Sequence, residues 1–165
     1  MKKSQQGVGL VEVLVALLVL AIGLLGFIAL QYQAVEATSE STARIQAINL
    51  ARDMAERIRV NREGLADYIS ELADPAEQAD FSTDCMTTAC TVTEMADFDV
   101  AQVVNKAHGI GMSINLIGCQ GNNDGRQCVY IAWGDTAPTD GNTNGDCTTG
   151  TSYNPASTCL IMEVY

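Results

Sequence analysis

An apolar run near the N-terminus constrains this chain more than any other feature. Between Val8 and Leu30 only Glu12 is charged, and Val13 to Leu30 is an uncharged stretch of 18 residues. That length is enough for a helix to cross the hydrocarbon core of a bilayer. A secretory signal has a shorter apolar core, about 7–15 residues, followed by small residues. The run therefore predicts a membrane helix.

Insertion of this helix is favourable in spite of its carboxylate. Each large apolar side chain favours the membrane by about 0.3–0.6 kcal/mol, whereas one carboxylate costs about 3 kcal/mol. Lys2 and Lys3 precede the run, and no basic residue follows it before Arg44. The positive-inside rule therefore places the N-terminus in the cytoplasm and the C-terminal part outside.

Charge and cysteine content describe the rest of the chain. A net charge of −11 argues against nucleic-acid binding, because phosphate contacts need a basic surface. All six cysteines lie after residue 80, and an even number in a small exported domain favours disulfides. Zinc is the weaker alternative, because the sequence has no CxxC pair and its single histidine, His108, is not at ligand spacing from a cysteine.

Glu12 has two interpretations. In the first, its side chain reaches the lipid–water interface from the start of the helix, where a carboxylate also favours the helix dipole. In the second, cleavage after Gly7 removes MKKSQQG, and the new amine of Val8 lies four residues from Glu12 on the same helix face. The two charges attract strongly where the dielectric constant is low. An amine from a neighbouring subunit would set the register of a helical assembly.

The residues K-K-S-Q-Q-G-V-G-L-V-E-V-L-V-A-L resemble the class III signal of type IV pilins and pseudopilins. That signal has a short basic leader ending in Gly, then an apolar helix with Glu at its fifth position. The continuation most closely resembles the PilV-type minor pilins, which are similar to I-class type II secretion pseudopilins. The resemblance covers about residues 1–35. It departs from the family at Val8 and Gly9, where most members have Phe or Met and then Ser or Thr.

The resemblance implies a processing route, partners and a location. Gly7 and Val8 would flank the prepilin peptidase site, Val8 would be N-methylated, and Glu12 would govern methylation and subunit register. The implied partners are other minor pilins, the major pilin, the prepilin peptidase and the inner-membrane assembly platform. The implied location is the inner membrane and then the pilus, with a role in pilus assembly that affects adhesion and motility.

An amphipathic pattern follows the apolar run and predicts a continuous helix from Val8 to Glu63, which Gly64 ends. The apolar stripe of this pattern consists of Ala34, Ala37, Ser41, Ile45, Ile48, Ala51, Ala55 and Ile58. We therefore expect a leader at 1–7, a transmembrane or filament-core helix at 8–30, a stalk helix at 31–64 and a globular pilin domain at 65–165.

The globular domain begins with an acidic segment, 65–96, which we expect to be irregular. Asp97 is the expected cap of a short helix from Phe98 to Ala107. Alternating apolar residues then predict three strands, around 110–116, 129–133 and 160–164. The expected fold is α+β, a long helix packed on a small antiparallel sheet stapled by disulfides, and type IV pilins are similar in this arrangement.

The alternation also suggests a disulfide pattern. If the apolar residues of the first two strands face inward, Cys119 and Cys128 both face outward at adjacent strand ends. Pairing them leaves Cys85–Cys90 to close a local loop and Cys147–Cys159 to close the loop before the last strand. Six cysteines allow 15 connectivities, so other pairings stay open.

One loop has half of a calcium-binding pattern. Asp140, Asn142, Asn144 and Asp146 carry oxygen ligands at suitable spacing, but position twelve is Thr151 instead of a bidentate Glu. Asp, Asn and Gly also favour ordinary turns, which is the better interpretation. We expect no other cofactor.

Three alternatives to a minor pilin remain. A type II secretion pseudopilin would use the same parts for export, and a membrane-tethered binding domain would keep its first seven residues. An exported hydrolase is the weakest, because the sequence has no evident Ser–His–Asp set and no phosphate-binding loop. An enzyme is therefore not expected.

Overall fold

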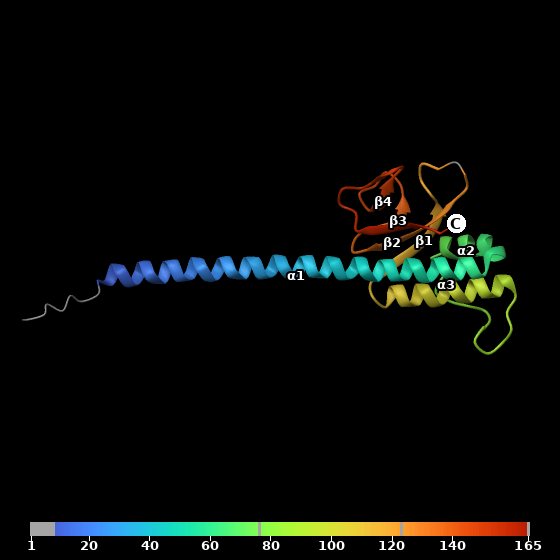
Figure 1. Cartoon of the computed structure of the whole chain (residues 1–165), viewed down its shortest axis with the longest axis horizontal. Coiled ribbons are helices and arrows are strands. Elements are labelled where there is room, and N and C mark those ends of the chain that lie inside the picture. Colours follow the sequence, from blue (N-terminus) through green and yellow to red (C-terminus); the bar gives the residue numbers. More distant parts are fainter. Residues whose placement is uncertain (1–8, 76, 123, 165) are drawn as a thin grey trace, which may run out of the picture. The chain divides into compact units, whose positions relative to one another are not determined.

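The computed structural model describes residues 9–75, 77–122 and 124–164. The chain divides into two compact units, Met1–Thr42 and Ala43–Tyr165. Helix α1, Leu10–Val60, runs through the boundary between them (Figure 1). Near this boundary the hydroxyl of Thr38 donates to the carbonyl of Ala34 at 2.8 Å, and that of Thr42 donates to the carbonyl of Thr38 at 2.9 Å. These bonds satisfy the threonines within the helix.

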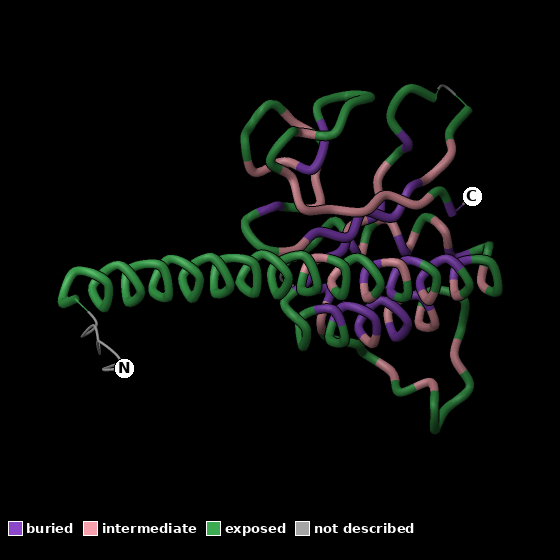
Figure 2. The backbone as a smooth tube through the Cα atoms, turned by 60° about the vertical axis from the view of Figure 1, so that its left-hand side comes forward, coloured by how far each residue is buried: buried purple, intermediate pink, exposed green. Residues whose placement is uncertain are grey.

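The second part of α1 carries a buried stripe that belongs to the core of the compact unit (Figure 2). Its buried residues are Ala47, Leu50, Ala51, Met54, Ala55 and Ile58. The predicted stripe included Ala51, Ala55 and Ile58 but placed Ile45 inside, whereas Ile45 is 58% exposed. The buried stripe is rotated around the helix relative to the predicted one, because Leu50 and Met54, which the predicted stripe omitted, pack in the core.

The predicted end of this helix is wrong by three residues. Helix α1 ends at Val60, and Asn61 leaves the helical region with φ −111° and ψ 56°. The Asn61 side chain donates to the carbonyl of Val92 at 2.8 Å, which fixes the break. Gly64 lies in the short 3₁₀ helix η1, Arg62–Gly64, and a Cβ there would lie 2.8 Å from Asn61 Nδ2. Gly64 therefore permits a close turn after the end of α1.

Segment 65–96 is more ordered than expected. Its first part forms helix α2, Leu65–Ala73, which buries Tyr68 and Leu72. The amphipathic spacing of Leu65, Tyr68, Ile69 and Leu72 was present in the sequence, but the acidic residues between them obscured it.

Helix α3, Val92–His108, also begins six residues earlier than predicted. Its cap is Thr91, whose hydroxyl accepts from the backbone N–H of Glu94, while the Glu94 carboxylate accepts from the Thr91 N–H at 2.8 Å. This is a capping box, a Thr followed three residues later by Glu. Asp97 is not a cap and instead accepts two hydrogen bonds from Ser82, at 2.8 and 2.9 Å.

The main sheet is antiparallel and has the order β1-β2-β6. Its strands are β1, Met112–Gly118, β2, Gln127–Trp133, and β6, Cys159–Glu163. Ile110 was expected in the first strand but precedes it and is 42% exposed. On one face of the sheet Met112, Ile114, Leu116, Val129 and Ile131 join the core with the helices. This α+β arrangement, a long helix on a small antiparallel sheet, confirms the expected fold class.

A second small sheet, which the sequence analysis missed, lies beyond the opposite face. It consists of β3, Ala137–Asp140, β4, Asp146–Thr149, and β5, Ser152–Tyr153, in the order β3-β4-β5. Residues of both regions form a second core cluster, whose buried members are Cys119, Cys128, Tyr130 and Cys147. Strand β2 is consequently buried on both faces, whereas the alternation had suggested a single buried face.

Candidate assembly surface

The first part of α1 presents a long apolar surface. Its large apolar residues between Leu10 and Val35 are 49–77% exposed (Figure 2). An 18-residue window of this helix has a mean hydropathy of 3.1 and is 0% buried. By length and composition this is the one helix among the described residues that could span a membrane. So large an apolar surface is stable only against lipid or other protein.

Glu12 interrupts this surface from the first turn of the helix. Its backbone N–H donates to the carbonyl of Gly9 at 2.9 Å, and the residue is exposed. A carboxylate in the first turn is favoured by the helix dipole. Gly7 and Val8, the expected cleavage and methylation positions, lie outside the described residues.

Two glycines lie in the same apolar surface. A Cβ added to Gly23 or Gly26 would meet no atom within 4 Å, so both positions face open space in the isolated chain. In membrane helices glycine allows a second helix to approach closely. It also lowers helix stability by about 1 kcal/mol, so local unwinding is the alternative use of these positions.

A network of polar contacts, partly buried, holds the second part of α1 in the compact unit. Asp99 of α3 is 7% exposed, and its carboxylate accepts from the guanidinium of Arg57 and, at 2.6 Å, from the hydroxyl of Tyr68. Arg57 also donates to Asp53 at 2.9 Å, and the ammonium of Lys106 lies 3.2 Å from the same carboxylate. These contacts join α1, α2 and α3.

The environment shifts the pKa values of these groups. Burial raises the pKa of the Asp53 carboxyl, but hydrogen bonds from Arg57 and Lys106 outweigh burial and leave the pKa below its ordinary value. Burial and the hydrogen bond to Asp99 raise the pKa of Tyr68 well above its ordinary value. Tyr68 is therefore a hydrogen-bond donor at every physiological pH. Sequence reasoning missed this network, and only the Asp53–Arg57 spacing pointed to part of it.

The six cysteines form three disulfides, Cys85–Cys90, Cys119–Cys128 and Cys147–Cys159. These are the pairs suggested by the sequence. Cys119 and Cys128 lie outside the main core, as expected of cysteines that face outward, but they are not exposed to solvent, since they are 9% and 6% exposed in the second cluster. The physical reason is that the second sheet, which the alternation did not predict, covers that face.

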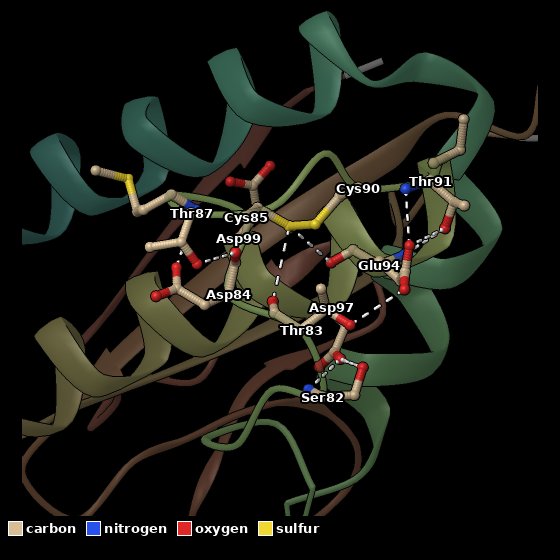
Figure 3. The surroundings of a disulfide bond; sticks show 12 residues. Ser82, Thr83, Asp84, Cys85, Thr87, Cys90, Thr91, Glu94, Asp97 and Asp99 are labelled. Atoms are coloured by element: carbon tan, nitrogen blue, oxygen red, sulfur yellow. Dashed lines mark hydrogen bonds between the residues drawn. A yellow bond between two sulfur atoms is a disulfide. The ribbon is translucent and has the colours of Figure 1, made fainter.

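The Cys85–Cys90 disulfide lies directly before α3 (Figure 3). Within its loop the N–H of Met86 donates to the Asp84 carboxylate at 2.9 Å. The hydroxyl of Thr83 donates to Glu94 at 3.1 Å, so Glu94 also contacts the segment before the disulfide. The disulfide and the capping box together fix the start of α3.

The loop with the half calcium pattern lies in the second sheet. Asp140 accepts hydrogen bonds from the Thr148 hydroxyl at 2.7 Å and from the Gly150 N–H at 2.8 Å. Asp146 accepts from the hydroxyl of Thr139 at 2.6 Å and from Thr143 at 2.8 Å. The bond from Thr139, followed by those from Thr143, lowers the pKa of Asp146.

The hydrogen bonds to Asp140 and Asp146 therefore stabilise a turn. Asn142 and Asn144 lie in the same turn-rich segment. Among the described residues no group of three or more His, Cys, Asp or Glu side chains could hold a metal ion. His108 lies exposed at the end of α3.

Comparison with known protein families gives two matches. Residues 2–28 match the prokaryotic N-terminal methylation motif, and residues 29–101 match the family of type IV pilin Tt1218. The two matches support a type IV pilin subunit. No curated protein and no solved structure gives a match.

The fold is consistent with that of a type IV pilin, a long N-terminal helix on a small antiparallel sheet with disulfides. The pilin family is structural, not enzymatic. The methylation motif and the exposed apolar helix fit a pilin anchored in a membrane that assembles into a pilus. The family suggests assembly with other pilins and membrane machinery, and the exposed apolar surface of α1 is consistent with that.

Proposed function

We propose that this chain is a minor pilin that helps to initiate or modify type IV pilus assembly. The observation that supports this most directly is the exposed apolar part of α1 with Glu12 as its one charge before Glu36. A subunit that initiates assembly uses such a helix in two environments, first in the inner membrane and then against the helices of neighbouring subunits. The partners would be other minor pilins, the major pilin and the inner-membrane assembly platform.

In this proposal prepilin peptidase cleaves between Gly7 and Val8, and the new amine of Val8 is methylated. The N-terminus before cleavage lies in the cytoplasm and the domain at 65–165 in the periplasm, as the distribution of lysines around the run favours. Glu12 then pairs with an N-terminal amine of a neighbouring subunit. Away from water this attraction is strong, and an unpaired carboxylate is costly, so the pair selects one register.

Intact mass and N-terminal sequencing of the native protein test the processing step. We expect loss of MKKSQQG, one added methyl group on Val8 and a mass that corresponds to three disulfides. A native chain that enters filaments with its first seven residues intact would contradict the proposal and leave the apolar run as a tether.

The Glu12→Val variant tests the register step. It should still insert in the membrane, because losing a charge favours insertion, but its incorporation into filaments should fall at least tenfold. Glu36→Val is the matched control, since Glu36 lies on the same helix beyond the uncharged run. Equal filament incorporation of the two variants, with full methylation, would rule out a register role for Glu12.

The same geometry suits a type II secretion pseudopilin. A deletion separates the two systems, because loss of surface pili supports the minor pilin and loss of protein secretion with intact pili supports the pseudopilin.

A further inference from the structure

Strand β6 lies at one edge of the main sheet and pairs with β2 alone. The N–H of Trp133 donates to the Thr158 carbonyl and the N–H of Val164 donates to the Gln127 carbonyl, each at 3.0 Å. Successive residues of an antiparallel strand point their backbone groups alternately toward and away from the partner strand. The backbone N–H and C=O groups of Cys159, Ile161 and Glu163 therefore point away from β2. Among the described residues, none of these groups has a hydrogen-bond partner.

The opposite edge of the sheet is different. There the N–H of Cys119 donates to the Arg126 carbonyl at 2.9 Å, so the even-numbered residues of β1 point their backbone groups outward. One of them, the Leu116 N–H, donates to the side-chain oxygen of Asn115 at 2.8 Å. Helices α2 and α3 also pack close to β1. The chain thus closes part of its β1 edge by itself.

Strand β6 has few of the features that usually protect an edge, and its one charged residue is Glu163 at its end. Its sequence, CLIME, contains no Lys and no Pro, and its pairing with β2 is regular from Cys159 to Glu163. Its residues are partly exposed along the strand (Figure 2).

Both faces of β6 are nevertheless held in place. Leu160 and Met162 pack against the main core, Ile161 packs in the second cluster, and Cys159 is bonded to Cys147. The free backbone groups are therefore fixed in an extended geometry, ready for another strand.

We propose that the outer edge of β6 binds an extended segment of another protein by β-strand addition. Alternating N–H and C=O groups recognise one kind of ligand, an extended backbone that offers the complementary groups. The net charge of −11 favours a neutral or basic segment and disfavours a second copy of this chain, because like charges repel. The proposal that β6 binds another strand does not depend on the proposed function. A partner in the pilus would be one source of the added segment.

Hydrogen exchange on the full chain tests this proposal. The backbone amides of residues 159–163 are compared between the purified chain in detergent micelles and the chain in its native cell-envelope fraction, filaments included. We expect exchange of the Cys159, Ile161 and Glu163 amides to be at least tenfold slower in the native fraction. Residues 112–118 of β1 serve as the control and should change less than twofold. Equal exchange at 159–163 in both samples would overturn the proposal.

Proline variants separate backbone pairing from side-chain packing. Ile161→Pro removes an N–H that the sheet itself does not use, and Ile161→Ala loses the same packing but keeps the N–H. In the native fraction, the Cys159 and Glu163 amides should be protected in the Ala variant and lose that protection in the Pro variant. Glu163→Pro and Glu163→Ala form a second pair at an exposed position, in case Ile161→Pro fails to fold. Equal protection within the pair that folds would overturn the proposal.

A further control tests whether the strand that binds β6 comes from a second copy of this chain. Protection that appears in micelles and grows with the concentration of the purified chain would mean that a second copy occupies the edge, which would overturn a heterologous partner. Cleavage at Gly7 is measured separately by mass, so failure of the proposed function and failure of the strand acceptor are distinguishable.

Discussion

The two parts of α1 show how differently one helix uses its apolar residues. From Leu10 to Val35 the large apolar residues lie exposed around the helix, whereas from Ala47 to Ile58 they form one buried stripe. The buried stripe has its partner in the same chain, in the sheet and in α2 and α3. The exposed part must find its partner elsewhere. Substitutions in the two parts should therefore affect different properties, stability in one and assembly in the other.

The sharpest test of this comparison is a pair of identical substitutions on α1. Leu50→Ala removes a side chain that is 1% exposed and should lower the free energy of unfolding of the compact unit by roughly 3 kcal/mol, because it leaves a cavity. Leu20→Ala removes one that is 59% exposed and should change that free energy by less than about 0.5 kcal/mol. Chemical denaturation of the full chain in detergent, followed by Trp133 fluorescence, measures both. Equal losses would break the comparison.

A second test sets a partly buried ion pair against an exposed one on α1. Asp99→Ala leaves the Arg57 guanidinium and the Tyr68 hydroxyl without their acceptor and should lower the free energy of unfolding by about 2 kcal/mol. Glu56→Ala removes the exposed pair with Arg59, found at 2.6 Å, and should cost less than about 0.5 kcal/mol. Denaturation midpoints under one condition give the ranking. A larger loss for Glu56→Ala would argue against the network.

A smaller effect is expected at the start of α3. Thr91→Ala removes the cap hydroxyl and should lower the free energy of unfolding by about 1 kcal/mol. Thr91→Ser keeps the hydroxyl and is the matched control, expected to remain within about 0.5 kcal/mol of the native chain. Thermal unfolding of the three proteins measures how much the cap hydroxyl contributes. Equal losses for Ala and Ser would mean that the methyl group, and not the cap, stabilises this turn.

The smallest effect is the loss of stability in acid, to which several carboxylates contribute. Hydrogen bonds lower the pKa values of Asp53, Glu94 and Asp146 below those in the unfolded chain, which are 3.8 for Asp and 4.5 for Glu. Their stabilisation is complete above these values and is lost as the pH falls through the lower folded values. Chemical denaturation between pH 7 and pH 3 should show a decline that begins near pH 4.5. The exposed part of α1 should keep its helical circular dichroism, which would sharpen the comparison. A chain equally stable at pH 3 and pH 7 would contradict it.

The sequence predicted some elements well because their signals are local. The uncharged run, the three alternating strands and the α+β class depend on patterns that neighbouring residues carry. The start of α3 was also encoded locally, in Thr91 and Glu94, but Asp97 was chosen as the cap in its place. The acidic composition of 65–96 likewise hid the spacing that forms α2. In both segments, two local signals compete.

Other features depended on residues far apart in the chain. The end of α1 at Val60 is fixed by Asn61 and the carbonyl of Val92, which lie 31 residues apart. Burial of Cys119 and Cys128 depends on the second sheet, which starts at Ala137. No periodicity around these cysteines could reveal that cover, since alternation describes a strand and not what packs against it.

The amino-acid order by itself determined that this chain carries an apolar helix with one early carboxylate, because charge and hydropathy are properties of the residues alone. The even number of cysteines and their position after residue 80 also favoured disulfides over a zinc site. Only the tertiary structure decided that Arg57, Tyr68 and Asp99 meet, that β2 is buried on both faces and that β6 has a free edge. Those features arise because segments far apart in the sequence pack together, and a local sequence pattern does not identify which distant residues will be in contact.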